Sequence, residues 1–450
     1  MRDAKDRGQQ NRPRSTDLTT SPAFPARGYA WTVVAILVAT AVLSYTDRQV
    51  LSLLVDPVRA ELHISDTQIS LLLGSAFAVV YGIAGIPLGY LADRASRRNL
   101  IFAGVLVWSV GTLACGFARS FSELFMARIV VGLGEAVLSP AAISLIADYF
   151  PPARRGLAVG AFLSGIAMGL GLSIVIGGGV LRLVEAGTFL GTPLQSLSAW
   201  RLVLVLIGAP GLLWALVILM IREPQRRPEG GVSRVAEDHP PTGLMRVLAR
   251  AAPLYLIVAM ASLVDNAVGA WAPSLLIREF NRDAATVGMQ LGLLITAGFG
   301  GGVLIGGWLA DRAALSGDYA RKLLVCLLAG AMILPVAASL NGSALSLVIL
   351  AIPAYFALSG IVTACGFSSI LDVVPPHSRA FAMAISFFLN VAVGAGIGPT
   401  AVALTHERLF TAPGGLGASI AVTIGWGYLI VIAAAMIARR LSRPMAAALR

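Results

Sequence analysis

Long apolar runs recur along the whole chain, and each is long enough to cross a membrane. A membrane-spanning helix needs about 20 predominantly apolar residues. Only 13% of the residues are charged, whereas about 25% is usual for a soluble domain. Outer-membrane barrels carry short alternating segments rather than continuous apolar runs. The sequence therefore predicts an all-α membrane protein.

Twelve spans account for the apolar runs. One long polar segment in the interior, 222–251, begins with a stretch rich in proline, glycine and charge, so we expect a linker there. The predicted organisation is a tail (1–28), a six-helix bundle (29–221), the linker, a second six-helix bundle (252–438) and a tail (439–450). The expected spans are 29–54, 67–91, 99–119, 122–149, 154–180, 200–221, 252–276, 285–310, 321–341, 344–371, 378–404 and 417–438.

The basic residues predict the orientation. Because successive spans cross in opposite directions, the loops between them alternate between the two sides of the membrane. Of the 34 Lys and Arg residues, 25 then lie on the side of the termini and the linker, and 7 on the other side. Cytoplasmic loops carry an excess of basic residues, so we expect both termini in the cytoplasm and the chain in the inner membrane. The same rule explains the net charge of +11 without nucleic-acid binding.

The two predicted halves resemble each other in sequence. GYLADR (89–94) returns as GWLADR (307–312), 218 residues later, and the same offset carries Asp47-Arg48 onto Asp265-Asn266. PPARR (151–155) matches PPHSR (375–379) at an offset of 224, which sends Glu135 to Ser359. Parallel six-helix repeats within one chain occur in one large transporter fold.

Several motifs are similar to those of one superfamily. GYLADRASRR (89–98) resembles the loop motif between the second and third spans of the major facilitator superfamily, with Ser96 where glycine is usual. RIVVGLGEAVLSPAAISLIADYFPPARRG (128–156) resembles its fourth-span motif. Two further motifs, SYTDRQ in the first span and GLGEA in the fourth, resemble sequences of the Spinster family. The resemblance implies two pseudo-symmetric six-helix bundles and transport of sphingosine phosphate or lysophospholipids, driven at least partly by protons.

In the first half, four ionisable residues lie deep inside predicted spans: Asp47, Arg48, Arg128 and Glu135. A charge at mid-bilayer costs about 2.5–3.5 kcal/mol or more, so these residues must face one another or water. One interpretation is an ion-pair network that only joins the first and fourth spans. We favour proton coupling by Asp47 and Glu135, because the second half has a charged counterpart only for Asp47. A network needed only for packing would be expected in both halves. Arg48 and Arg128 would then tune the carboxylates and attract an anionic headgroup.

Two further groups of residues are candidates. Possible cavity residues are Tyr45, Asp265, Asn266, Trp271, Thr363 and Asn390. A cytoplasmic gate is expected at the loop motifs, which by resemblance hold the two halves together in the outward-facing state, although such charges are also commonly just solvated. Its candidates are Gly89, Asp93, Arg94, Arg97, Arg98, Asp148, Arg154, Arg155, Asp311 and Arg312.

The sequence thus predicts a proton-coupled secondary transporter of an amphiphilic lipid, working as a monomer by alternating access. The alternative is a transporter of hydrophobic drugs or small organic anions on the same fold. No nucleophile–base constellation, metal-ligand cluster or P-loop lysine occurs in the sequence. We therefore expect neither an enzyme nor a cofactor, and no bound metal.

Overall fold

Twelve helical stretches of the described chain are long and apolar enough to cross a membrane. The structure, a computed structural model, describes residues 24–92, 94–226, 244–315, 319–342, 344–374, 379–412 and 414–448. The predicted twelve-span, all-α architecture is confirmed. The observed spans are Arg27–Leu53, Asp66–Gly85, Arg97–Phe117, Phe121–Tyr149, Arg154–Glu185, Ala199–Leu219, Ala251–Phe280, Ala284–Ala313, Ala320–Ser339, Leu345–Val373, Ile385–Leu409 and Gly415–Leu441.

The spans are built from sixteen α-helices within the described ranges, with short 3₁₀ and π-helical turns between some of them. In the first half these are α1 (Arg27–Gln49), η1 (Val50–Leu53), α2 (Val55–Leu62), α3 (Asp66–Ser70), η2 (Leu71–Ser75), α4 (Ala76–Ala92), α5 (Arg97–Phe117), α6 (Phe121–Glu135), α7 (Leu138–Tyr149), α8 (Pro152–Glu185), η3 (Pro193–Ser196) and α9 (Ala199–Leu219). In the second half they are α10 (Leu244–Phe280), α11 (Ala284–Leu315), α12 (Tyr319–Ser339), α13 (Leu345–Val373), α14 (Arg379–Leu389), η5 (Asn390–Ala395), α15 (Gly396–Leu409) and α16 (Gly415–Ala448).

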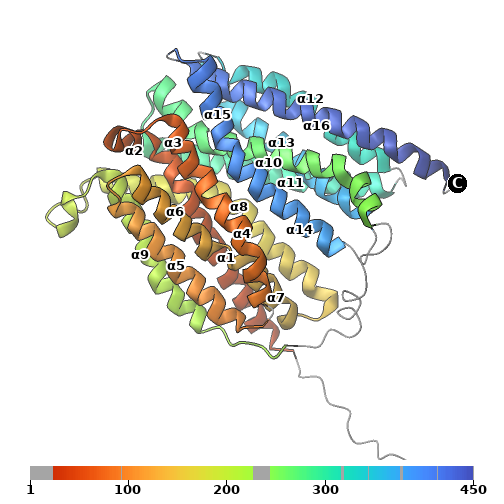
Figure 1. Cartoon of the computed structure of the whole chain (residues 1–450), viewed down its shortest axis with the longest axis horizontal. Coiled ribbons are helices and arrows are strands. Elements are labelled where there is room, and N and C mark those ends of the chain that lie inside the picture. Colours follow the sequence, from red (N-terminus) through yellow and green to blue (C-terminus); the bar gives the residue numbers. More distant parts are fainter. Residues whose placement is uncertain are drawn as a thin grey trace, which may run out of the picture.

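The helices form two bundles side by side, α1–α9 and α10–α16 (Figure 1). We call the end that carries α2 and the end of α15 the α2 end, and the opposite end, where α1 begins and residues 222–226 follow α9, the linker end. One buried apolar cluster lies wholly within the first bundle, around Trp108 and Phe162. The other joins residues of α2, α3 and α9 to the second bundle. The two halves therefore share a packed core at the α2 end.

Helix α2 is a difference from the sequence prediction, which treated 55–66 as a connection. Its eight residues bury Val55 and Val58 on one face, while Arg59 and Ala60 are exposed. A single turn of apolar residues is enough to dock such a short helix on a bundle, but it is too short to stand out as a periodic pattern. Helices α10 and α16 also extend beyond the predicted ends of their spans.

The first and fourth spans are both interrupted. The fourth is divided between α6 and α7 at Ala136 and Val137, and Ala136 lies four residues before Pro140. A proline ring clashes with the carbonyl four residues earlier and offers no N–H to it, which explains the break. The first span changes from α1 to the 3₁₀ turn η1 after Gln49. Both breaks lie beside the intramembrane charges.

Candidate functional site

The four intramembrane charges meet where these interruptions face each other. Together we call Asp47, Arg48, Arg128 and Glu135 the charge cluster. Arg128 donates from Nη1 to the Asp47 carbonyl at 3.0 Å, from Nη2 to the Arg48 carbonyl at 3.3 Å, and from Nε to the Leu72 carbonyl at 3.2 Å. The last carbonyls of an α-helix lack partners within the helix. Arg128 therefore satisfies the end of α1 and the π-helical turn η2.

Arg48 and Glu135 form a buried ion pair between α1 and α6. Arg48 Nη2 lies 2.6 Å from Glu135 Oε2, the Glu135 side chain is fully buried, and that of Arg48 is 13% exposed. The guanidinium carbon of Arg48 is 4.7 Å from the ring centroid of Tyr45, 3.8 Å from that of Phe77 and 5.9 Å from that of Tyr81. Aromatic faces attract a cation at such distances, so carboxylate and rings together hold Arg48.

The Asp47 carboxylate is buried differently. The residue is 1% exposed, and neither carboxylate oxygen accepts a hydrogen bond of normal geometry from the residues that the structure describes. Thr112 and Trp108 of α5 face it, and their own donor atoms likewise have no partner of normal geometry among the described residues. An ionised carboxylate without partners is costly in a membrane interior. The arrangement favours a neutral Asp47 in this conformation.

The predicted cavity residues of the second half are divided between packing and polar contacts. Asp265 accepts hydrogen bonds from Tyr355 and Ser359, and Asn266 donates to the Ser262 carbonyl at 2.9 Å. Trp271 is fully buried and donates from Nε1 to the Pro399 carbonyl at 2.8 Å, which makes it a packing contact of α10 with α15.

The other two cavity candidates make fewer contacts. The Asn390 carbonyl accepts a hydrogen bond from Ser262 Oγ at 3.0 Å. The Thr363 hydroxyl is buried without a partner among the described residues. The second-half candidates do not join the charge cluster.

The gate candidate Arg97 is the centre of a buried network at the linker end. It donates to Asp148 Oδ2 and, from Nε, to Glu223 Oε1 at 2.8 Å. Glu223 also accepts from the Arg98 backbone N–H at 2.8 Å and from Ser96 Oγ at 3.0 Å. These contacts join α5, α7 and the segment after α9, all within the first half.

Three of the remaining gate candidates have contacts with residues of their own half. The guanidinium carbon of Arg94 lies 3.5 Å from the ring centroid of Tyr90, and that of Arg312 lies 4.4 Å from the ring centroid of Trp308. Arg155 donates to the Phe150 carbonyl at 3.1 Å. Asp93 lies outside the described residues. Three further candidates face solvent or open space: Arg154, Asp311 and Gly89, where an added Cβ would meet nothing within 4 Å.

The Glu223 contacts predict a pH-dependent contribution to stability. Burial raises the pKa of Glu223, but the Arg98 N–H and the Arg97 guanidinium outweigh burial and lower it. Its contribution is therefore complete above the unfolded-state pKa of about 4.3 and is lost as pH falls through the lower folded-state value. We expect Glu223→Gln to cost about 1 kcal/mol at neutral pH. Thermal unfolding from pH 7 to pH 3 should show this difference shrink on acidification, and a constant difference would contradict the assignment.

At the α2 end, ion pairs connect the two halves. Arg278 of α10 binds both carboxylate oxygens of Asp66 at 2.9 Å and Asp56 Oδ1 at 2.6 Å. Thr67 donates from its backbone N and from Oγ1 to Glu407 of α15, at 2.8 and 2.5 Å. Two further hydrogen bonds join the halves, from Ser70 Oγ to Thr400 Oγ1 at 3.2 Å and from Ser75 Oγ to the Gly396 carbonyl at 2.7 Å. We call Asp56, Asp66, Arg278, Thr67 and Glu407 the α2-end latch.

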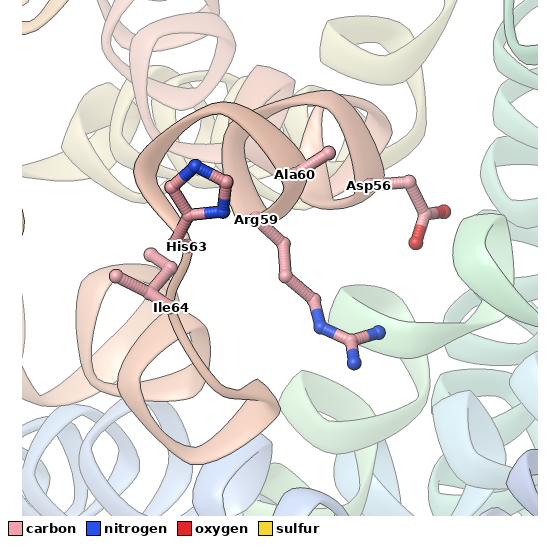
Figure 2. Close-up of a pocket in the computed structure, with 5 residues that line it drawn as sticks. All are labelled: Asp56, Arg59, Ala60, His63 and Ile64. Atoms are coloured by element: carbon pink, nitrogen blue, oxygen red, sulfur yellow. The ribbon is translucent and has the colours of Figure 1, made fainter.

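A recess of about 460 Å³ opens beside the latch. It is lined by Asp56, Arg59, Ala60, His63 and Ile64 (Figure 2). Figure 2 shows Asp56 and Arg59 extending from α2, and His63 at its end. Arg59 lies 3.6 Å from Asp66, so the recess borders the latch rather than the charge cluster.

Two glycine pairs let α8 and α11 cross closely near the same end. A Cβ on Gly178 would lie 2.8 Å from the Ala285 carbonyl oxygen and 2.9 Å from Gly288 Cα. A Cβ on Gly171 would lie 2.3 Å from the Gly292 carbonyl oxygen. Contacts this short are with backbone atoms that cannot rotate away. The structure is thus closed at the α2 end by both packing and charge.

The sequence of the whole molecule now places it in a family. A sequence model of the Major Facilitator Superfamily matches residues 37–399. The chain belongs to the major facilitator superfamily. This superfamily member is therefore a membrane transport protein with the two-bundle fold that its internal repeat predicted, and its predicted resemblance to Spinster proteins is confirmed.

Its relatives carry the names of different kinds of transporter. An MFS-type efflux pump of Mycolicibacterium smegmatis is 29% identical over 388 residues, covering 84% of this chain and 85% of the relative. The D-galactonate transporter of Escherichia coli O6:H1 is 29% identical over 336 residues, covering 68% of this chain and 73% of the relative. Protein spinster homolog 1 of Bos taurus is 29% identical over 294 residues, covering 60% of this chain and 52% of that protein.

A solved structure shares the fold. The crystal structure of a bacterial homologue of the human lysosomal transporter Spinster, inward-facing and unoccupied, superposes with a TM-score of 0.78 at 24% identity. The match covers 92% of this superfamily member and 98% of that chain. At this identity the likeness establishes the fold alone.

Sequence reasoning missed several residues of the site. Phe77 and Tyr81 lie around Arg48 but read as ordinary aromatic residues of an apolar span. Glu223 was assigned only to a linker, although a carboxylate directly after a span is a natural partner for the basic loop motif. Asp56, Asp66, Arg278 and Glu407 lie in four different segments, and no spacing in the sequence relates them.

Proposed function

We propose that this chain is a proton-coupled transporter of an amphiphilic anion, of the lysophospholipid or phosphorylated sphingoid-base class. We further propose that it resides in the inner membrane as a monomer, with its linker end in the cytoplasm. The observation that carries the proposal is the buried Arg48–Glu135 ion pair. In the preceding position of α1, the Asp47 carboxylate accepts no hydrogen bond of normal geometry from a described residue.

The ion pair gives a physical route to coupling. Arg48 can bind an anion fully only when Glu135 releases it. Removing one partner of a buried ion pair leaves an uncompensated charge, at a cost of several kcal/mol. A proton on Glu135 removes that cost, because it neutralises the carboxylate as the guanidinium turns to the substrate. Proton and anion are then expected to bind together.

Within the charge cluster, Arg48 is the better candidate for the substrate contact. Its side chain keeps some exposure and has aromatic rings on several sides, whereas all three donor groups of Arg128 already bind carbonyls. The planar fork of arginine suits phosphate and carboxylate alike. Arg128 would instead hold α1 and η2 in position. The rings of Tyr45, Phe77 and Tyr81 offer apolar surface beside a headgroup.

A second candidate function is transport of a small organic anion. The relative named D-galactonate transporter favours it, because a sugar acid also presents a carboxylate to Arg48. The two candidates differ in whether an apolar chain contributes to binding. A thermal-shift panel of lysophospholipids, phosphorylated sphingoid bases, drugs and sugar acids separates them, and stabilisation by sugar acids alone would reject the lipid class.

Glu135→Gln tests the coupling. The amide imitates the protonated acid, so Arg48 should be free at every pH. Coupling between two ligands is typically worth 1–3 kcal/mol, or about 5–150-fold in affinity. In proteoliposomes we expect the variant to retain exchange of a lysophospholipid and to lose uptake driven by a pH gradient. Affinity in the wild type should vary with pH within that range, and affinity in the variant should not.

The control is Glu123→Gln at the start of the same helix. Glu123 accepts a hydrogen bond from the backbone N–H of Arg119 at the helix end and does not touch the charge cluster. It should keep pH-driven uptake. Undiminished pH-driven uptake in the Glu135 variant would remove Glu135 from coupling.

A further inference from the structure

The second half contains a buried carboxylic acid that the charge cluster does not use. Asp265 of α10 occupies the position that the internal repeat equates with Asp47, and Ser359 of α13 the position equated with Glu135. In the structure these two repeat partners touch: Ser359 Oγ donates to Asp265 Oδ1 at 2.6 Å. The second half therefore retains the place of the charge cluster, with its arginines replaced.

The hydrogen bonds of Asp265 fit both of its protonation states. Tyr355 donates to the same Oδ1 at 2.7 Å, so both hydroxyls converge on one oxygen. That oxygen can serve as an ionised oxygen or as the carbonyl of a neutral acid without either hydroxyl turning. The other oxygen, Oδ2, is left to carry a proton. Asp265 is 8% exposed, so it is nearly but not completely sealed.

No cation in the described part of the chain pairs with this carboxyl group. No described Arg, Lys or His residue forms an ion pair with Asp265. The titratable groups that face it are Tyr355 from α13 and Tyr428 from α16, with the Cys326 thiol of α12 beside Tyr428. The Tyr355 and Tyr428 rings meet edge to face with centroids 6.1 Å apart, and the Tyr428 hydroxyl has no hydrogen bond of normal geometry to a described residue. A charge surrounded only by hydroxyls is costly in a membrane interior.

We propose that Asp265, held by Tyr355 and Ser359, is a second proton-binding site in the second half of the transporter, independent of the charge cluster. Its ligand is a proton, exchanged with water when movement of the halves opens α10 to solvent. The inference rests on the proposed function for its role in transport, but the site itself can be tested without transport.

Infrared difference spectroscopy of the purified full chain on changing pH tests the site directly. Asp265→Asn keeps the shape of the side chain and its acceptor oxygen. We expect one protonated-carboxyl C=O band to be lost in this variant and to persist in Glu135→Gln and Asp47→Asn. Tyr355→Phe removes a donor from the carbonyl oxygen, so the same band should move to higher frequency. If every such band survives in a folded Asp265→Asn protein, or if Tyr355→Phe leaves all bands unmoved, the proposal is overturned.

Transport then measures the role of the site. The number of protons moved per substrate, obtained from the reversal potential in proteoliposomes, should fall by one in Asp265→Asn. The control is Ser274→Ala, which removes a buried hydroxyl without a described partner from the same helix and should change neither the band nor the stoichiometry. If the wild type moves no protons, the proposed function fails while the infrared result still decides the site. An unchanged stoichiometry with a lost band would overturn the role in transport.

Discussion

Replacing Gly178 by valine is expected to prevent closure at the α2 end and to abolish transport. A Cβ at this position would contact the Ala285 carbonyl oxygen, the Met289 backbone nitrogen and Gly288 Cα, all within 2.9 Å. Extra methylene groups in a packed interface cost about 1–3 kcal/mol even where side chains can give way, and backbone atoms cannot. A cost of about 3 kcal/mol lowers the ratio of closed to open molecules roughly 100-fold.

The measurement is the distance between spin labels at two exposed positions of this end, Ala60 on α2 and Arg408 on α15. The wild type should show a short distance, and Gly178→Val a shift to longer ones together with loss of substrate exchange. Gly179→Val is the matched control, since a Cβ there meets nothing within 4 Å and the effect on helix propensity is the same. Equal behaviour of the two variants would show that the crossing does not control closure.

The fold was predictable because lipid leaves few alternatives. Without water to bond the backbone, a span in a continuous apolar run must be a helix. The repeats GYLADR and GWLADR then indicated two similar halves, and the structure has both. Helix α2 was missed for the opposite reason: it lies outside the apolar runs and forms by docking Val55 and Val58 on the bundle.

The site was only partly predictable, because its partners depend on where helices break. A regular helix would have kept the carbonyls of Asp47 and Arg48 within α1, and Arg128 would have needed another partner. The change to the 3₁₀ turn η1 leaves these two carbonyls without partners inside the helix. The residues of η1 do not by themselves predict this change. The break before Pro140 is different, since the proline four residues after Ala136 was a readable signal. The contacts of Arg278 depend on the packing of two halves and have no local signal.

Closure at the α2 end also explains where the charges of the latch lie. The α2-end latch and the α8–α11 crossing join the halves toward one end, while the Arg97 network stays within the first half. Alternating access requires the first set of contacts to break when the opposite end closes. The latch must therefore be strong enough to define a state and weak enough to release, and charge pairs at a partly exposed rim meet both conditions.

Arg278→Gln is expected to shift the transporter away from the state closed at the α2 end. The change removes three charge-assisted hydrogen bonds and leaves Asp56 and Asp66 near each other without their shared cation. Hydrogen bonds to charged groups contribute about 1.5–3 kcal/mol each. Partial exposure of Arg278 and Asp56 screens these pairs, so we expect a total near 3 kcal/mol, or about 100-fold in the closed-to-open ratio.

The labels at Ala60 and Arg408 report this shift as a longer distance. Comparing the shifts of two Arg278 variants separates the contribution of its charge from that of its planar fork. Arg278→Lys keeps the charge but not the fork that binds both oxygens of Asp66, so it should lie between wild type and Arg278→Gln. Combining Arg278→Gln with Asp56→Asn removes one uncompensated charge and should recover part of the closed population. Arg282→Gln, at an exposed arginine of the same end, should change nothing. If Arg278→Gln leaves the distances at their wild-type values, the glycine crossing alone closes this end, and the latch is a consequence of closure rather than its cause.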